Sequence, residues 1–259
     1  MDNKLADKVL KGDVGAAARL ISAIEGGEAA ALAELKKLEK HRGRAYVIGI
    51  TGPPGAGKST IIGQLTPVFR ERNLSVGIIA ADPLSLVSRG AILGDRVRML
   101  PWCDEGVFMR SLASTGGCGG LATSTPAVVK VMDALGRDII ILETMGSGQA
   151  DVDVINLADT CVLVLNPGSG DDIQMLKAGI LEVADILVIN KADRDGTAEL
   201  KKGLEFMLDT RVSKRDGSRP PIVLTQAIYG EGISDLAAEI IKRREIQKVG
   251  KSSAVRGKR

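Results

Sequence analysis

The sequence predicts an α/β fold in which a mostly parallel β-sheet carries helices on both faces. Short runs rich in Ile, Val and Leu alternate with helix-length segments over most of the chain, which is typical of parallel strands joined by helical crossovers. Aromatic residues make up only 2% of the composition, so aliphatic side chains must build the core. At 259 residues the chain is long enough for one sizeable domain.

The N-terminal region predicts a helical hairpin that precedes the main fold. Residues 3–24 and 28–41 carry apolar side chains at helical spacing, and Gly26 and Gly27 separate the two segments. We therefore expect an N-terminal helical extension over residues 1–43.

The β-rich pattern begins at Tyr46, and residues 44–241 are expected to form the main domain. Apolar runs of strand length occur at 46–50, 76–80, 138–143, 160–166, 185–190 and 221–225. The run at 106–110 is either a further strand or part of a long excursion.

Charge is distributed unevenly along the chain. The net charge is +3, but residues 242–259 contain eight Lys or Arg against Glu245 alone, so residues 1–241 carry −4. We expect residues 242–259 to be a frayed, solvated basic tail, with binding of an acidic partner or nucleic acid as the alternative. The scarcity of aromatic side chains disfavours nucleic-acid binding through base stacking.

The composition also excludes several other classes of protein. No run reaches eighteen apolar residues and the N-terminus has mixed charge, so we expect a cytoplasmic protein without a membrane segment. Three widely spaced cysteines, Cys103, Cys118 and Cys161, and a single imidazole at His41 support neither a disulfide framework nor a Cys/His metal site.

A phosphate-binding loop follows the first predicted strand. The segment GPPGAGKS at 52–59 fits G-x-x-x-x-G-K-[ST] between a strand and a helix, so backbone N–H groups and the positive end of the helix can surround phosphates. Lys58 would reach the β- and γ-phosphates. The predicted binding residues are Gly52, Pro53, Pro54, Gly55, Ala56, Gly57, Lys58, Ser59 and Thr60.

The metal ion of such a site is Mg²⁺, and its expected ligands are oxygen atoms. The Ser59 hydroxyl is the first candidate, and Glu143, at the end of the run DIIILE, is the second, directly or through water. Asp82, at the end of VGIIAAD, is placed similarly and is a further candidate.

The base is predicted to be guanine. Residues Asn190, Lys191 and Asp193 fit N-K-x-D after an apolar run, and a carboxylate at Asp193 accepts hydrogen bonds from guanine N1–H and N2 that adenine lacks. Gln226 and Ala227 occupy the place where many GTPases have a Ser-Ala pair that touches the guanine oxygen. Gln226 departs from that pattern.

Taken together, ITGPPGAGKST, DPLSLVSRGAILGDRVRM, GGLA, ETMGSGQAD, NPGSGDDIQMLKAGI and VINKAD resemble the motifs of the MeaB/ArgK-type GTPases. These are accessory proteins of adenosylcobalamin-dependent methylmalonyl-CoA mutase. The resemblance implies a P-loop NTPase fold and Mg²⁺-dependent hydrolysis of GTP to GDP and phosphate. It also implies a chaperone role that gates cofactor loading and protects an acyl-CoA mutase partner.

The same resemblance implies roles for residues outside the common motifs. Asp95 matches an acid of the metal and hydrolysis region, Gln149 lies in the second switch, and Lys177 falls on the Lys of a third switch loop. With Lys58 they are the candidate catalytic residues. Members of the family usually continue into a helical arm that forms a homodimer, and this chain lacks a matching segment.

Three other functions remain open from the residues. A metal-insertion GTPase shares this machinery but usually displays His or Cys clusters. A transport-linked P-loop kinase would transfer the γ-phosphate to an acceptor other than water. A nucleotide switch with negligible turnover would use the site for binding alone.

Overall fold

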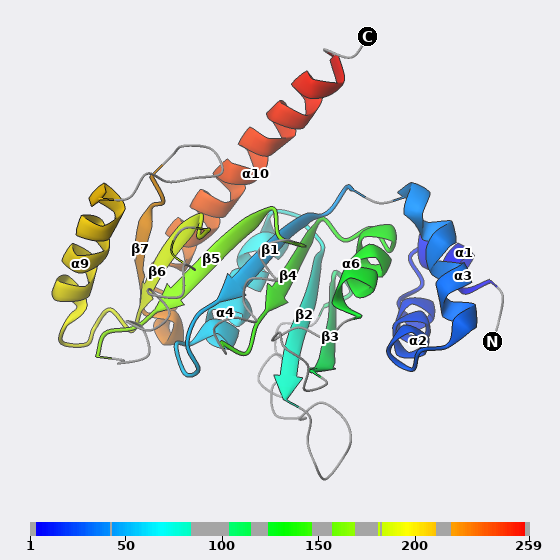
Figure 1. The fold of residues 1–259 in the computed structure, drawn as a ribbon, viewed down its shortest axis with the longest axis horizontal. Helices are drawn as coiled ribbons and strands as arrows, with labels where there is room; N and C mark the ends of the chain where they lie inside the picture. The colour runs from blue at the N-terminus through cyan, green and yellow to red at the C-terminus, as the bar shows by residue number, and fades with distance from the viewer. Residues whose placement is uncertain are drawn as a thin grey trace.

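A computed structural model describes residues 4–41, 43–83, 104–114, 124–146, 157–168, 181, 183–210 and 219–256. Seven strands form one sheet in the order β3-β2-β4-β1-β5-β6-β7, and each pair of neighbours is parallel (Figure 1). The strands are β1 (Tyr46–Thr51), β2 (Val76–Pro83), β3 (Val107–Ser114), β4 (Ile139–Glu143), β5 (Thr160–Leu165), β6 (Ile186–Asn190) and β7 (Ile222–Thr225). The predicted fold class is confirmed.

Each apolar run of strand length becomes a strand. The side chains of β1, β4, β5 and β6 are buried along their whole length, as expected for parallel strands covered on both faces. The run at 106–110, whose assignment was open, belongs to β3 at one edge of the sheet.

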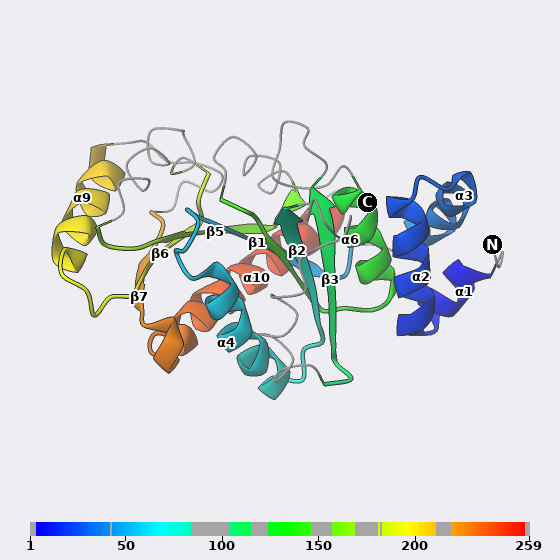
Figure 2. The ribbon, with the colours of Figure 1, turned by 90° about the horizontal axis from the view of Figure 1, so that it is seen from below.

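Helices cover both faces of the sheet (Figure 2). On one face α4 (Lys58–Glu71) and α10 (Ile233–Arg256) pack side by side, and Phe69 and Ile240 share a core cluster with Ile48 and Val188 of the strands. The other face is covered by α6 (Thr125–Ala134) and by α9 (Thr197–Thr210), which lies at the β7 end.

The C-terminal helix α10 continues through position 242, where the basic segment begins, to Arg256. Its last turns project past the sheet (Figure 1). Within the described residues, no helix is both long enough and apolar enough to cross a membrane.

The N-terminal region differs in detail from a two-helix hairpin. It contains α1 (Leu5–Leu10), α2 (Val14–Glu25), α3 (Ala29–Leu38) and a short 3₁₀ turn, η1 (Glu39–His41). The helix expected over residues 3–24 is therefore divided at residues 11–13. The division has a local cause, because the Asp13 carboxylate accepts a hydrogen bond from Ala16 N at 2.8 Å and begins a new helix.

Polar contacts fix the end of α2 and the segment that leads into β1 to the rest of the fold. The carboxylate of Asp133, on α6, accepts hydrogen bonds from the main-chain amides of Gly43, Arg44 and Ala45, which lead into β1. Arg110 of β3 donates to Glu25 Oε2 at 2.7 Å, at the end of α2. The N-terminal helices are thus held against α6 and the edge strand.

Candidate nucleotide-binding site

The phosphate-loop motif lies at the carboxyl end of β1 and leads directly into α4. This placement sets the first turn of α4, whose N–H groups have no acceptors within the helix, toward the loop. Lys58 is the first residue of α4 and is only 6% exposed. Its ammonium group donates to the main-chain oxygens of Gly52 at 2.7 Å and of Pro53 at 3.0 Å. The Lys58 side chain therefore lies inside the phosphate loop, where its ammonium group is hydrogen-bonded to two main-chain oxygens of that loop.

Two oxygen-bearing side chains meet beside this loop. The Ser59 hydroxyl donates to Glu143 Oε1 at 2.6 Å. Strand register explains the meeting, because Glu143 is the last residue of β4 and is aligned with Ile50 of β1. The two predicted Mg²⁺ ligands are thus brought together at the carboxyl edge of the sheet.

For the other predicted metal ligands, the structure gives the backbone position of Asp82 only and does not describe Asp95. Asp82 is the last residue but one of strand β2 and lies two residues beyond Ala80, which is aligned with Glu143 on the neighbouring strand. Its backbone is therefore at the same edge of the sheet. Asp95 lies outside the described residues, as do the candidate catalytic residues Gln149 and Lys177.

Asn190, at the end of β6, joins the base motif to the phosphate loop. Its side-chain amide donates to the main-chain oxygen of Ala56 at 2.8 Å. Its side-chain oxygen accepts from Thr225 Oγ1 and from Ala227 N, both at 3.1 Å. Gly57 permits the approach, because a Cβ at that position would lie 2.2 Å from the Asn190 amide nitrogen. The side chain is 3% exposed, so all three contacts are buried.

A cavity of about 290 Å³ opens between the base motif and the loop after β7. Lys191 lines the cavity and donates to the main-chain oxygen of Gly55 at 2.7 Å. Asp193 is exposed and lines the cavity. The remaining lining residues are Gly57, Thr60, Asn190, Arg194, Gln226, Ala227, Ile228 and Tyr229. The structure thus brings both predicted parts of the base site to one cavity.

The sequence motifs did not single out Arg194, Ile228 and Tyr229 among these lining residues. Ile228 is 75% exposed and Tyr229 is 74% exposed, so two large apolar side chains border the cavity. Ile228 and Tyr229 directly follow Gln226 and Ala227 in the sequence. This closeness to the predicted base loop is the sequence signal that could have identified them as lining residues. They lie in the short 3₁₀ turn η4 (Ala227–Tyr229).

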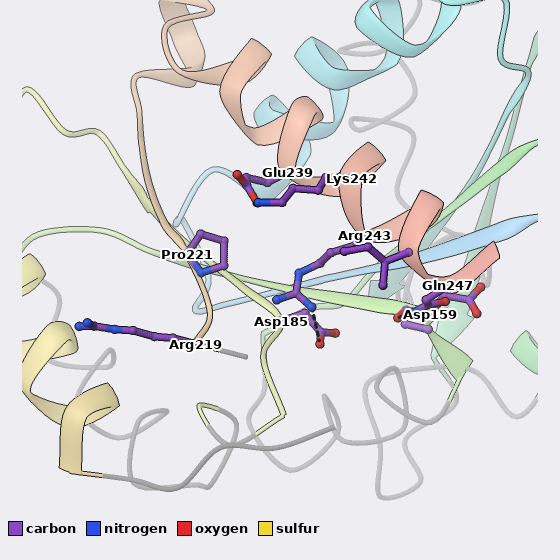
Figure 3. Close-up of a pocket in the computed structure, with 10 residues that line it drawn as sticks. Asp159, Asp185, Arg219, Pro221, Glu239, Lys242, Arg243 and Gln247 are labelled. Atoms are coloured by element: carbon purple, nitrogen blue, oxygen red, sulfur yellow. Dashed lines mark hydrogen bonds and ion pairs between the residues drawn. The ribbon is translucent and has the colours of Figure 1, made fainter. Parts of the chain in front are cut away.

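A second cavity of about 560 Å³ lies at the opposite edge of the sheet, beneath α10 (Figure 3). Its lining includes Asp185, immediately before β6, and Arg243 of α10, which form an ion pair at 3.4 Å. At its border Lys242 pairs with Glu239 at 3.7 Å. Lys242 and Arg243 of α10 therefore each form an ion pair with a neighbouring carboxylate. Among the described residues, no group of three or more His, Cys, Asp or Glu is arranged to hold a metal ion.

Comparison with known proteins agrees with this geometry. The family described as Methylmalonyl Co-A mutase-associated GTPase MeaB matches residues 17–259. A Pyrococcus abyssi protein named as a GTPase is 46% identical over 263 aligned residues, covering 100% of this chain and 81% of that protein. The mitochondrial methylmalonic aciduria type A homolog of Mus musculus is 35% identical over 195 residues, covering 74% of this chain and 47% of that protein.

A solved structure extends the likeness to three dimensions. The crystal structure of a LAO/AO transport system kinase superposes with a TM-score of 0.78 at 25% identity, and the match covers 100% of this chain and 81% of that one. The fold is that of P-loop GTPases, and the Pyrococcus abyssi relative is named as a GTPase. The chain belongs to the MeaB family of methylmalonyl-CoA mutase-associated GTPases.

Proposed function

We propose that this GTPase is an accessory protein of an adenosylcobalamin-dependent acyl-CoA mutase such as methylmalonyl-CoA mutase. In this role it gates loading of the cofactor and protects the mutase, and the binding and hydrolysis of GTP would control when these steps occur. The observation that carries the proposal is the match to a mutase-associated family over residues 17–259. The contacts between the phosphate loop and the base motif support it, because a chaperone of this kind must bind guanine nucleotide.

The triphosphate is bound by the loop from Gly52 to Thr60. The amides at the start of α4 would donate to phosphate oxygens, and the partial positive charge of the helix end favours the anion there. Lys58 would exchange the oxygens of Gly52 and Pro53 for those of the β- and γ-phosphates. In the structure these two carbonyl oxygens hold the ammonium group in the loop.

Ser59 and Glu143 would hold Mg²⁺, with Asp82 and Asp95 as further ligands. The donor set fits this ion, because a hydroxyl and a carboxylate oxygen already lie 2.6 Å apart beside the loop and Mg²⁺ prefers oxygen ligands. When bound, the ion would offset negative charge on the β- and γ-phosphates.

Guanine is read in the cavity between β6 and the loop after β7. The Asp193 carboxylate would accept from N1–H and the N2 amine of the base, which adenine does not offer. Lys191 and Asn190 are both tied to the phosphate loop, at Gly55 and Ala56. The base and the phosphates would therefore be positioned by one connected set of contacts.

Hydrolysis requires groups that position the attacking water and stabilise charge as the γ-phosphate departs. Lys58 supplies one positive charge, and Asp95, Gln149 and Lys177 are proposed to complete the site. Lys177 follows β5, whose carboxyl end lies between those of β1 and β6, so we propose that it links the nucleotide state to the mutase.

The test is GTP hydrolysis by the purified protein with and without a cobalamin-dependent mutase. We expect the mutase to raise kcat. Lys177→Ala should retain most of the GTP affinity but lose most of this stimulation, whereas Lys58→Ala should lose hydrolysis under both conditions. A mutase that neither binds the protein nor alters turnover would overturn the proposed partner while leaving the GTPase assignment intact.

A second candidate is a kinase, favoured by the 25% identity to a structure named as a transport system kinase. The two candidates differ in the acceptor of the γ-phosphate. GTP labelled at the γ position distinguishes them, because a GTPase releases the label as inorganic phosphate whereas a kinase transfers it to an amino acid or protein.

A further inference from the structure

The loop that completes the base cavity is closed by a pair of side chains. Gln226 Nε2 donates to Glu231 Oε2 at 2.5 Å, and Gln226 N donates to Glu231 O at 3.1 Å. The two residues also form an isolated antiparallel bridge. The four residues between them include Ala227, Ile228 and Tyr229, which line the cavity. We call the Gln226–Glu231 pair the loop clasp.

The chemistry of the clasp defines its orientation. A carboxylate only accepts hydrogen bonds, so the Gln226 side chain must present its NH₂ group to Glu231. At a comparable site a hydrogen bond to a charged acceptor is stronger than a neutral one, and solvent screens this bond in part because the pair is exposed. A serine at position 226 is too short to form the same contact. The departure of Gln226 from the usual pattern thus has a structural partner five residues later.

Further contacts hold the backbone inside the clasp. Tyr229 N donates to Gln226 O at 2.9 Å, and Ala227 N donates to Asn190 Oδ1 at 3.1 Å. The return segment is packed closely on β7, since a Cβ at Gly232 would lie 2.0 Å from the Leu224 oxygen. The exposed apolar side chains of Ile228 and Tyr229 are therefore presented to the cavity by an ordered turn.

We propose that Glu231 is a positioning residue for guanine recognition and acts through Gln226. The clasp holds η4 in the shape that forms one wall of the base cavity. Ordering this turn before the ligand arrives removes an entropic cost from binding. The inference rests on the proposed guanine site and adds a residue outside the common motifs. Loss of the Glu231 carboxylate should lower the affinity for guanine nucleotide more than it lowers the stability of the fold.

The experiment exchanges the two partners. Gln226→Glu places two carboxylates against each other, and Glu231→Gln leaves a neutral amide pair. The double variant Q226E/E231Q restores one amide and one carboxylate with their positions reversed. We expect Gln226→Glu to raise the GTP dissociation constant about tenfold, Glu231→Gln to raise it about threefold, and the double variant to recover most of the loss.

Three further readouts distinguish positioning of the base from a general structural role. The preference for GTP over ATP should fall in Gln226→Glu and return in the double variant. In the same variant KM should rise by a larger factor than kcat falls. Melting temperatures of the nucleotide-free proteins report any loss of the fold itself.

The proposal is overturned if Gln226→Glu binds GTP as the unaltered protein does. It is also overturned if the double variant is no better than the sum of the single changes. Failure of the guanine site itself would look different, because the unaltered protein would then show no preference for GTP over ATP.

Discussion

Asn190 and Ala56 are separated by 134 positions, yet the side-chain amide of Asn190 donates to the Ala56 main-chain oxygen at 2.8 Å. The other end of the same side chain accepts from Thr225 and Ala227. One buried amide therefore connects the phosphate loop with both segments of the base site. The fold itself therefore brings the two halves of the site together.

Replacing this amide should damage both stability and binding. Asn190→Ala leaves the Ala56 oxygen and the Ala227 amide buried without this partner, so we expect the free energy of unfolding to fall by about 2–4 kcal/mol. GTP affinity should fall as well. Urea unfolding and nucleotide titration measure the two effects. Thr225→Val removes only one donor to Asn190 and should cost about 1 kcal/mol. Equal losses in both variants would argue against the connecting role of Asn190.

The Ser59–Glu143 contact predicts how hydrolysis depends on Mg²⁺. Glu143→Gln removes a charge from the proposed ligand set, so we expect the Mg²⁺ concentration for half-maximal turnover to rise by about tenfold or more. Ser59→Ala should act in the same direction. Initial rates of phosphate release over a series of Mg²⁺ concentrations provide the measurement. Glu105→Gln, an exposed charge change at the other end of the strands, is the matched control. An unchanged Mg²⁺ requirement in Glu143→Gln would remove Glu143 from the ligand set.

Asp193→Asn should change which base is bound. The variant loses the acceptor for the guanine N2 amine and gains an NH₂ donor, so GTP should bind about 100-fold more weakly. XTP, which has an oxygen at the same ring position, should bind the variant better than it binds the unaltered protein. Fluorescent nucleotide titration compares the two. Asp195→Asn carries the same change two residues away, outside the cavity lining, and should leave both affinities unaltered.

Tyr46 predicts a loss of stability in alkali. Burial raises the pKa of its hydroxyl to about 12, from a usual value of 10.0. The neutral hydroxyl, which contacts Thr160 Oγ1, is favoured in the folded protein. Its contribution is therefore complete below pH 10 and is lost as the pH rises from 10 to 12. The shift is worth about 3 kcal/mol.

The measurement is the free energy of unfolding against pH for the unaltered protein and Tyr46→Phe. Lys and Arg titrate in both, so the difference between the two curves isolates Tyr46. We expect the advantage of the unaltered protein to shrink above pH 10. Parallel curves would show that Tyr46 ionises equally easily in the folded and unfolded chains.

Much of the fold and site follows from local sequence patterns. Runs that are almost wholly apolar, such as β5 and β6, indicate buried parallel strands, and the carboxyl ends of these strands must share one edge of the sheet. That rule alone brings Glu143 and Asn190 near the phosphate loop. The motif residues are predictable because phosphate and guanine impose their own geometry on the groups that bind them.

Other features depend on partners that are distant in sequence. Nothing near Asp133 shows that its carboxylate will bind the amides of residues 43–45. From the sequence, Gln226 is recognisable only as a departure from a motif. Its contact with Glu231 becomes evident in the folded structure. The break between α1 and α2 was not predicted for a different reason. Apolar residues keep their helical spacing through the turn that ends at Asp13, so the pattern indicated one continuous helix.

The edge strand β3 shows what the N-terminal helices protect. Among the described strands it pairs with β2 alone, so one side of its backbone is a template on which another chain's strand can add. Phe108 and Leu112 of β3 lie in the same core cluster as α1, α2 and α3, and Arg110 reaches Glu25. A chain shortened to begin at Arg44 would expose Phe108 and Leu112 beside this open edge. Apolar side chains next to an unpaired strand edge favour intermolecular β-pairing, so we expect such a chain to aggregate more readily than the full chain.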